Sequence, residues 1–188
     1  MIINMNTYKD TFEKETVKKV QEELGLKNVM AVPRLKKIMV NASSRDFLTD
    51  KKNLERAAED LGTIAGQKAK IAKAKISIAT FKLREGDKIG LTITLRGKRM
   101  YDFYEKLVKI VFPRVRDFNG VSSKMFDGCG NLSIGFAENT VFPEIDPGKV
   151  EKIRSLQVTI VTNAKDDNQA KVLLTAMGMP FKKGEGIK

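Results

Sequence analysis

The sequence contains no histidine and no tryptophan, and it has one cysteine, Cys129, among 188 residues. Histidine is the side chain most often used for acid and base catalysis at neutral pH, so its absence weighs against an enzyme. A single cysteine excludes an internal disulfide, and without histidine no zinc site of Cys and His ligands can be assembled. The Asp and Glu residues show no spacing that would bring two carboxylates together. We therefore expect no catalytic site, no metal and no cofactor.

Long hydrophobic stretches are also missing. There is no run of 18 apolar residues, and residues 1–15 mix Lys, Asp and Glu where a signal peptide would have a hydrophobic segment. At 41% apolar content, the chain is long enough for one buried core. We expect a cytosolic protein without a membrane partner, with a single domain over residues 1–182 and a flexible tail at 183–188.

Positive charge, by contrast, is abundant and concentrated. The formal net charge is +12, and residues 68–99 contain ten Lys or Arg against Glu85 and Asp87 alone. Such a block repels itself and therefore suggests a polyanionic partner. Ala and Ile alternate with the lysines, which favours a folded segment over a disordered basic tail. RNA, DNA and an anionic membrane are the candidates.

Hydrophobic periodicity predicts both helices and strands. In the expected helices apolar residues recur at intervals of three and four, whereas in the expected strands they alternate with polar ones. Two local features set helix ends: Pro113 closes the third helix, and Asp167 caps the last. Residues 114–130 follow neither period and predict a long exposed loop. The expected helices are 8–24, 50–65, 100–111 and 167–177, and the expected strands are 35–41, 88–96, 132–136 and 156–161, with a weaker strand or loop after residue 67.

This pattern predicts an α+β fold with an antiparallel or mixed sheet, helices packed on one face and the other face exposed. The exposed face lacks the aromatic side chains of a single-strand RNA reader. No strongly basic recognition helix or amphipathic membrane helix is predicted either. Structured RNA is the partner that remains, bound by polar side chains on the sheet and by Lys and Arg on loops. The polar face carries Lys37, Asn41, Thr92, Thr94, Arg96, Gln157 and Thr159.

Seven segments, in order along the chain, resemble the bacterial ribosomal large-subunit protein five family. They are VPRLKKIMVN (32–41), GQK (66–68), FKLREGD (81–87), TLRGKRMYDF (94–103), PRVRDFNGVS (113–122), FDGCGNLSIG (126–135) and FPEID (142–146). The resemblance spans residues 8–182. It implies a protein of the central protuberance that binds 5S rRNA, touches the elbow of the P-site tRNA and bridges to small-subunit head protein thirteen. It also implies contacts with 23S rRNA and with neighbouring central-protuberance proteins.

The resemblance also implies roles for individual residues. Asn41, Gln67 and Thr94 correspond to the polar positions that contact 5S rRNA, and we expect Lys37, Lys68, Thr92 and Arg96 to complete this site. The small-subunit bridge corresponds to Arg114, Arg116 and Phe118. The tRNA-contacting loop corresponds to Lys73, Lys75, Ser77, Thr80, Phe81, Lys82 and Arg84.

The chain departs from the family pattern at three places. Ser43, Ser44 and Arg45 replace a glycine-rich turn, Ala69 replaces a common proline, and Thr80 replaces a common glycine. Arg45 could contact an RNA phosphate or pair with Asp46 or Asp50 in solvent. Two functions stay open: a structural RNA-binding ribosomal protein, which we favour, and a free-standing RNA chaperone or regulator.

Overall fold

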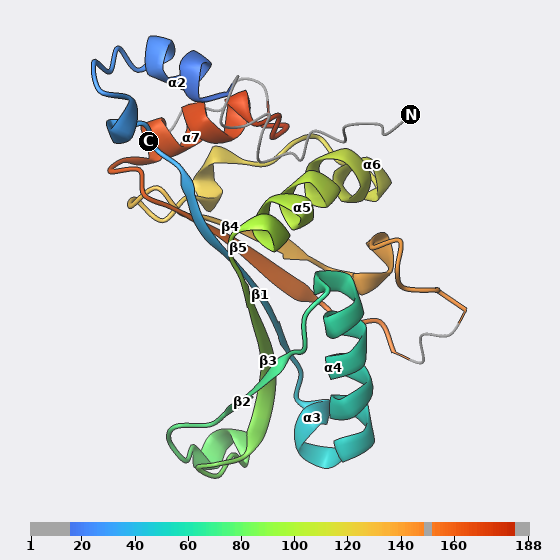
Figure 1. Cartoon of the computed structure of the whole chain (residues 1–188). Coiled ribbons are helices and arrows are strands. Elements are labelled where there is room, and N and C mark those ends of the chain that lie inside the picture. Colours follow the sequence, from blue (N-terminus) through green and yellow to red (C-terminus); the bar gives the residue numbers. More distant parts are fainter. Residues whose placement is uncertain (1–15, 149–151, 183–188) are drawn as a thin grey trace. The chain divides into compact units, whose positions relative to one another are not determined.

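The structure is a computed structural model that describes residues 16–148 and 152–182 (Figure 1). Five strands form one sheet in the order β2-β3-β1-β5-β4. β2 pairs antiparallel to β3, with Lys70 opposite Thr92. The combination of sheet and helices confirms the predicted α+β class. The strands are β1 (Leu35–Ser43), β2 (Lys70–Lys73), β3 (Lys88–Leu95), β4 (Leu132–Phe136) and β5 (Leu156–Thr162).

The chain divides into two compact units, which we describe separately. Unit 1 consists of Met1–Ile38, Arg96–Ile134 and Thr159–Lys188, and unit 2 of Met39–Leu95 and Gly135–Val158. The single domain expected over residues 1–182 stays a prediction, and the tail expected at 183–188 lies outside the described residues. Within the described ranges, no helix is long and apolar enough to cross a membrane.

Unit 2 is organised around helix α4 (Lys51–Ala65), which begins and ends as predicted. Asp50 Oδ1 accepts the N–H of Lys52 at 2.8 Å, and Gly66 ends the helix in the left-handed conformation at φ 62°. The helix buries one apolar face and contacts β3 (Figure 1). The other helical elements of unit 2 are α3 (Asp46–Thr49), η3 (Ala79–Phe81) and η6 (Asn139–Val141).

Unit 1 buries the aromatic face of helix α5 (Lys98–Lys106). Phe103 and Tyr104 are buried, and Tyr104 Oη donates to the carbonyl of Leu174 at 3.4 Å. Tyr8 and Phe12 of the first predicted helix lie outside the described residues. The helical elements of unit 1 are α2 (Val17–Glu23), η2 (Val29–Ala31), α5 (Lys98–Lys106), the π-helical η4 (Leu107–Val111), α6 (Phe112–Arg114), η5 (Ser123–Met125) and α7 (Asp167–Ala176).

The third helix does not end before Pro113, so this prediction was wrong. The chain continues from α5 through the π-helical η4 into α6, and Pro113 lies in the first turn of α6. Inside a continuous helix, a proline removes one N–H donor, and its ring meets the carbonyl groups of the preceding turn. The wider π turn before it avoids the clash of the ring with the preceding carbonyl groups.

The prediction that Asp167 caps the last helix was also wrong. Asp166 occupies the cap position without a side-chain cap hydrogen bond, and Asp167 is the first residue of α7. The Asp167 carboxylate instead accepts the backbone N–H groups of Gly128 at 3.0 Å and Gly130 at 2.8 Å. An aspartate at the start of this helix therefore holds a loop from an earlier part of the chain.

The segment 114–130 is only partly exposed, whereas the sequence predicts a long exposed loop. Val121 and Ser123 are buried, and η5 lies inside the segment. Val121 donates its N–H to the carbonyl of Pro180 at 2.8 Å, and its carbonyl accepts the N–H of Lys182 at 3.0 Å. The C-terminal end of the described chain thus pairs with the middle of this loop.

Candidate RNA interface

Polar side chains alternate with core residues on the two strands of unit 2 that the sequence singled out. Val40 on β1 and Leu91, Ile93 and Leu95 on β3 are buried, whereas the residues between them are half-buried. Because successive strand residues point to opposite faces, the polar set lies on the face away from the core. This set is Asn41, Thr92 and Thr94.

Asn41 and Thr92 are brought together across the two strands. The Thr92 hydroxyl donates to Asn41 Oδ1, and the two oxygens are 2.7 Å apart. Further along the same strands, the Ser43 hydroxyl donates to the carbonyl of Ile89 at 2.8 Å. The sequence predicts that Asn41 and Thr92 share one face but does not indicate that they bond, because strand register is not readable from either strand alone.

Gln67 joins this set from the end of α4. It follows the helix-ending Gly66, is half-buried, and its Nε2 donates to the carbonyl of Thr94 at 3.4 Å. Lys68, the next residue, is exposed. Gln67 therefore lies at a helix end beside the polar face. Lys37 and Arg96 belong to unit 1, where Lys37 is half-buried and Arg96 exposed.

The last residue of β2, Lys73, and the loop between β2 and β3 carry the residues predicted for the tRNA contact, and their side chains are exposed. Two hydrogen bonds close its base, from Ala74 N–H to the carbonyl of Asp87 at 2.8 Å and from Gly86 N–H to the carbonyl of Ala74 at 3.0 Å. Two side chains brace it further: Asp87 Oδ2 accepts the N–H of Arg84, and Ser77 Oγ accepts the N–H of Glu85. The loop is therefore held in shape although its side chains face solvent.

The tip of this loop is apolar as well as cationic; the residues predicted from the sequence include Phe81 but not Ile76. The exposed fraction is 71% for Ile76 and 63% for Phe81. Thr80, which stands where relatives commonly have glycine, does not have a positive φ; in this loop the non-glycine residue at positive φ is Lys82, at 52°. The backbone at Thr80 therefore does not require glycine.

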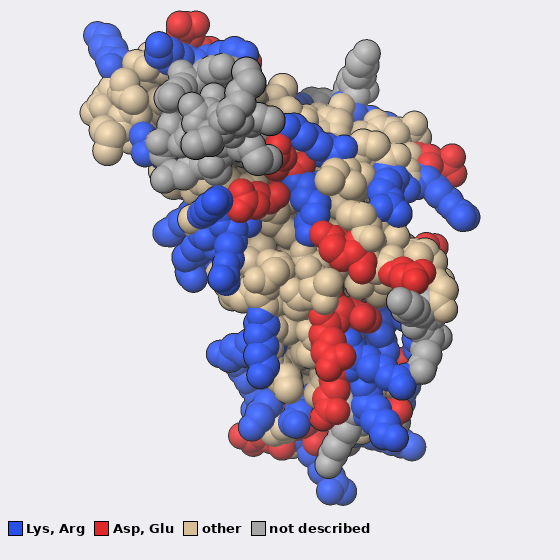
Figure 2. All heavy atoms as spheres, turned by 45° about the vertical axis from the view of Figure 1, so that its right-hand side comes forward, with Lys and Arg blue, Asp and Glu red and all other residues tan. Residues whose placement is uncertain are grey.

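The cations of this loop and the acids of unit 2 differ in how they are paired. Within the described chain, no ion pair involves Lys73, Lys75, Lys82 or Arg84. Two acids, in contrast, have cationic partners inside unit 2: Asp46 pairs with Lys152, and Asp60 lies 3.7 Å from Arg154. Figure 2 shows Lys and Arg on both sides of a band of acidic side chains in the region of α4 and the β2–β3 loop.

These acids have shifted pKa values. The hydrogen bond from Lys152 is the main cause that lowers the pKa of Asp46. Burial raises the pKa of Asp60, and the Arg154 guanidinium opposes that shift. Asp46 and Asp60 are thus each paired with a cation of unit 2, whereas the four loop cations have no ion-pair partner among the described residues.

The turn at residues 43–45 departs from the family pattern without needing glycine. Arg45 has a helical φ of −60°, and the Ser44 hydroxyl donates to Asp46 Oδ2 at 3.2 Å. Arg45 is exposed and makes no ion pair with another described residue. The alternative in which Arg45 pairs with Asp46 or Asp50 is therefore not seen, and Asp46 pairs with Lys152 instead.

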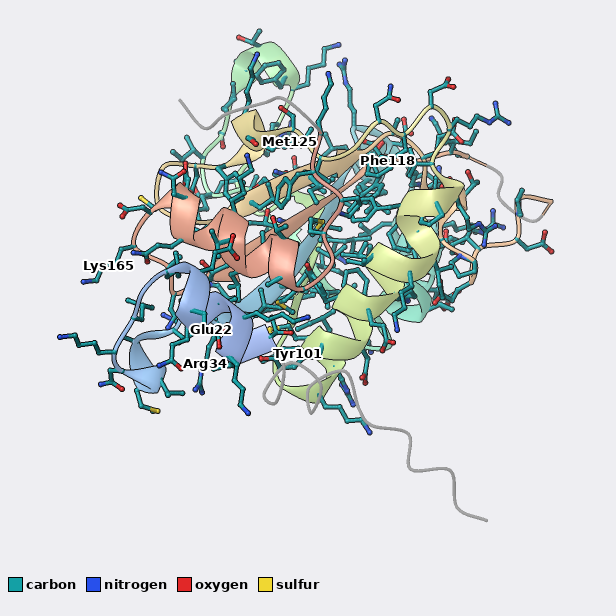
Figure 3. All side chains as sticks on the ribbon, turned by 90° about the horizontal axis from the view of Figure 1, so that it is seen from above. Glu22, Arg34, Tyr101, Phe118, Met125 and Lys165 are labelled. Carbon is teal, nitrogen blue, oxygen red and sulfur yellow. The ribbon has the colours of Figure 1, made fainter. Side chains whose placement is uncertain are left out.

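The three residues predicted to bridge to the small subunit differ in exposure. Arg114 is exposed, as is Arg116 within the loop, but Phe118 is half-buried. Its ring stacks on Phe112, with centroids 5.0 Å apart and an interplanar angle of 14°. Figure 3 shows Phe118 beside the α6 end of the helical segment. Phe118 therefore packs against its own unit, and the two arginines are the groups open to a partner.

Nothing in the described chain resembles a metal centre, since no three His, Cys, Asp or Glu residues are grouped to hold an ion. Cys129 is exposed. Its N–H and that of Asn131 are bound by Asp127 Oδ1 at 2.9 and 3.0 Å, so the Cys129 turn is a structural feature of the loop held by Asp167.

Comparison with known proteins agrees with this geometry over almost the whole chain. Residues 28–84 match the family described as Ribosomal protein L5, and residues 88–181 match the model for the C-terminus of the same ribosomal family. The Large ribosomal subunit protein uL5 of Desulfotalea psychrophila is 51% identical over 179 residues, which is 95% of this chain and 100% of the relative. The proteins of the same name from Trichlorobacter lovleyi and Francisella tularensis subsp. novicida are 49% and 51% identical over 178 residues, covering 95% of this chain and 99% of each relative.

These matches cover both the polar face of unit 2 and the β2–β3 loop, and the relatives are aligned almost from end to end. The family consists of structural ribosomal proteins, so the chain is not an enzyme. A basic protein with an unpaired cationic loop and a polar sheet face is what an RNA-rich particle requires. The chain belongs to the ribosomal protein L5 family.

Proposed function

We propose that the protein is a structural component of the large ribosomal subunit in the cytoplasm, where it binds 5S rRNA through the polar face of unit 2. Asn41, Gln67 and Thr94 contact the RNA, and Lys68 and Thr92 complete the site within that unit. Lys37 and Arg96, which belong to unit 1, are further cations proposed to contact 5S rRNA. The relatives are all named as large-subunit proteins, which supports a place in the large subunit. The polar face supports the binding of RNA.

The observation that carries this proposal is the row of neutral polar side chains on β1 and β3, held by cross-strand bonds next to unpaired cations. Amides and hydroxyls can donate to and accept from phosphates and 2′-hydroxyl groups, so they set the register of the RNA on the protein. The Lys and Arg residues supply attraction that does not depend on sequence.

The β2–β3 loop contacts the elbow of the P-site tRNA, in line with the family resemblance. Its closed base and braced shape support a role in contacting a large rigid partner, because an ordered loop loses little entropy on binding. The two exposed arginines after η4, Arg114 and Arg116, face small-subunit head protein thirteen, and 23S rRNA and neighbouring central-protuberance proteins are the remaining partners.

Binding of the purified full-length protein to 5S rRNA, measured across a salt series, tests the main proposal. If about four to eight phosphates are neutralised, the logarithm of the affinity should fall with the logarithm of salt with a slope of about −3 to −7. A flat salt response would contradict the proposal. Sedimentation of the cellular protein separates it from a free-standing RNA chaperone, since a ribosomal component should migrate almost entirely with large subunits.

Substitution of the polar residues tests where the RNA lies. Asn41→Ala and Thr94→Ala should each weaken 5S binding by about 1 to 3 kcal/mol, because an RNA polar group loses its partner. Thr63→Ala serves as the control, since the Thr63 hydroxyl bonds within α4, to the carbonyl of Glu59 at 3.0 Å. If both interface variants bind 5S rRNA as well as the control does, the RNA binds another surface.

A further inference from the structure

The hydrogen bond between Thr92 and Asn41 uses one end of the Asn41 amide and leaves the other. An asparagine side chain has one acceptor oxygen and an NH₂ group with two donors. The acceptor, Asn41 Oδ1, receives the Thr92 hydroxyl at 2.7 Å. Among the described residues, none accepts a hydrogen bond from Asn41 Nδ2. The NH₂ group is therefore the part of Asn41 that is available to a partner.

A threonine hydroxyl suits this arrangement because it can donate. The hydroxyl holds whichever end of the amide faces it, and in the structure that end is Oδ1, so Nδ2 lies on the other side. A valine in its place has the same shape but no hydroxyl, and it would leave Oδ1 without a donor.

The strands hold this pair in a fixed position. Val40 is fully buried on β1, and Leu91 and Ile93 are 2% exposed on β3, so core residues flank both members. The bond from Ser43 Oγ to the carbonyl of Ile89 ties the same two strands a short distance away. A binding group supported by packed strands and a bonded neighbour keeps its orientation before the ligand arrives.

We propose that Thr92 is a positioning residue: its hydroxyl orients the Asn41 amide so that the two Nδ2 donors face the RNA. Asn41 then binds an acceptor on the RNA, a phosphate oxygen or an acceptor on a base, and Thr92 acts through Asn41 without contacting the RNA itself. This inference rests on the proposed binding of 5S rRNA by the polar face.

The inference predicts a coupling between the two positions. Thr92→Val should weaken 5S rRNA binding by about five- to tenfold, and Thr92→Ser, which restores a hydroxyl, should recover most of the loss. The double variant Asn41→Ala with Thr92→Val should bind no more weakly than Asn41→Ala alone, because Thr92 has nothing left to orient. The slope of affinity against salt should not change in Thr92→Val, since no charge is altered.

A substitution at Asn41 tests the donor requirement without changing the size of the side chain. Asn41→Asp keeps an acceptor for the Thr92 hydroxyl but has no donor for the RNA, and its negative charge repels phosphates, so it should lose at least about tenfold in affinity. Asn41→Ala, which removes the donor without adding charge, should lose affinity as well. Thermal unfolding of each variant and of the control Thr63→Val shows that the fold is retained.

The outcomes separate this inference from the proposed function. If Asn41→Ala and Thr94→Ala both bind 5S rRNA normally, the polar face is not the RNA site, and both fail. If Asn41→Ala alone binds normally, Asn41 makes no RNA contact to be oriented, and only the positioning role is refuted. If Asn41→Ala is weakened but Thr92→Val is normal, or the two losses add, the proposed function stands and the positioning role is refuted. Normal binding by Asn41→Asp would refute the donor assignment in the same way.

Discussion

Replacing Asp167 with alanine should destabilise the protein much more than replacing its neighbour Asp166. Asp167 accepts the N–H groups of Gly128 at 3.0 Å and Gly130 at 2.8 Å, whereas Asp166 makes no side-chain cap hydrogen bond. Gly130 is buried and has φ +76°, and an added Cβ there would lie 3.0 Å from Ala164 Cβ. The loop is thus packed closely against the start of α7, and Asp167 supplies the acceptor for both N–H groups.

The magnitude follows from the two lost bonds. A buried N–H left without a partner costs about 1 to 3 kcal/mol, and the exposed Gly128 N–H, which water can satisfy, adds less. We expect Asp167→Ala to lower the free energy of unfolding by about 2 to 3 kcal/mol, and the melting temperature by about 4 to 12 °C for a chain of this size. Asp166→Ala should change it by about 0.5 kcal/mol or less.

Thermal and urea unfolding of the two variants provides the measurement. Asp167→Asn should be intermediate, because the amide keeps one acceptor oxygen while its NH₂ group faces the second N–H. Equal losses in Asp166→Ala and Asp167→Ala would mean that both act only as negative charges at the helix start, and the tether between loop and helix would be refuted.

Three further predictions concern the loop, the turn and pH. Removing residues 76–83 from the β2–β3 loop should leave 5S binding intact but weaken P-site tRNA on reconstituted ribosomes; equal loss of both would place the loop in the 5S interface. Arg45→Ala should make the salt slope of 5S binding shallower by about one unit, and an unchanged slope would exclude a phosphate contact. Desolvation of Asp127 is outweighed by hydrogen bonds from Asn131 and the Cys129 N–H, so its pKa lies below 3.8. The ionised Asp127 therefore stabilises the fold fully above pH 3.8, and this contribution is lost as the pH falls through the folded pKa. The difference in unfolding free energy between wild type and Asp127→Ala should shrink in acid. A difference that stays constant with pH would contradict this.

The candidate site was predictable in its composition but not in its bonds. The alternation of apolar and polar residues placed Asn41, Thr92 and Thr94 on one face, because the two-residue period of a strand can be read within the strand itself. The bond from Thr92 to Asn41 joins residues 51 apart in sequence, and it depends on how β1 and β3 align. Phe81 was predicted at the tip of the β2–β3 loop, but Ile76 was not, because isoleucine is usually found in a core.

The sequence by itself determined the features whose causes lie within one or two turns of chain. Helix α4 begins at the residue after Asp50 and ends before Gly66, because a cap and a left-handed glycine act on adjacent backbone groups. The positive charge of residues 68–99 is likewise a property of composition. Tertiary structure decided the rest. Asp167 binds a loop 37 and 39 residues away instead of capping its own helix. Pro113 follows a π turn and lies within the helical segment instead of ending it. In both cases a local preference was overridden, because hydrogen bonds and packing between distant segments are available only once the chain has folded.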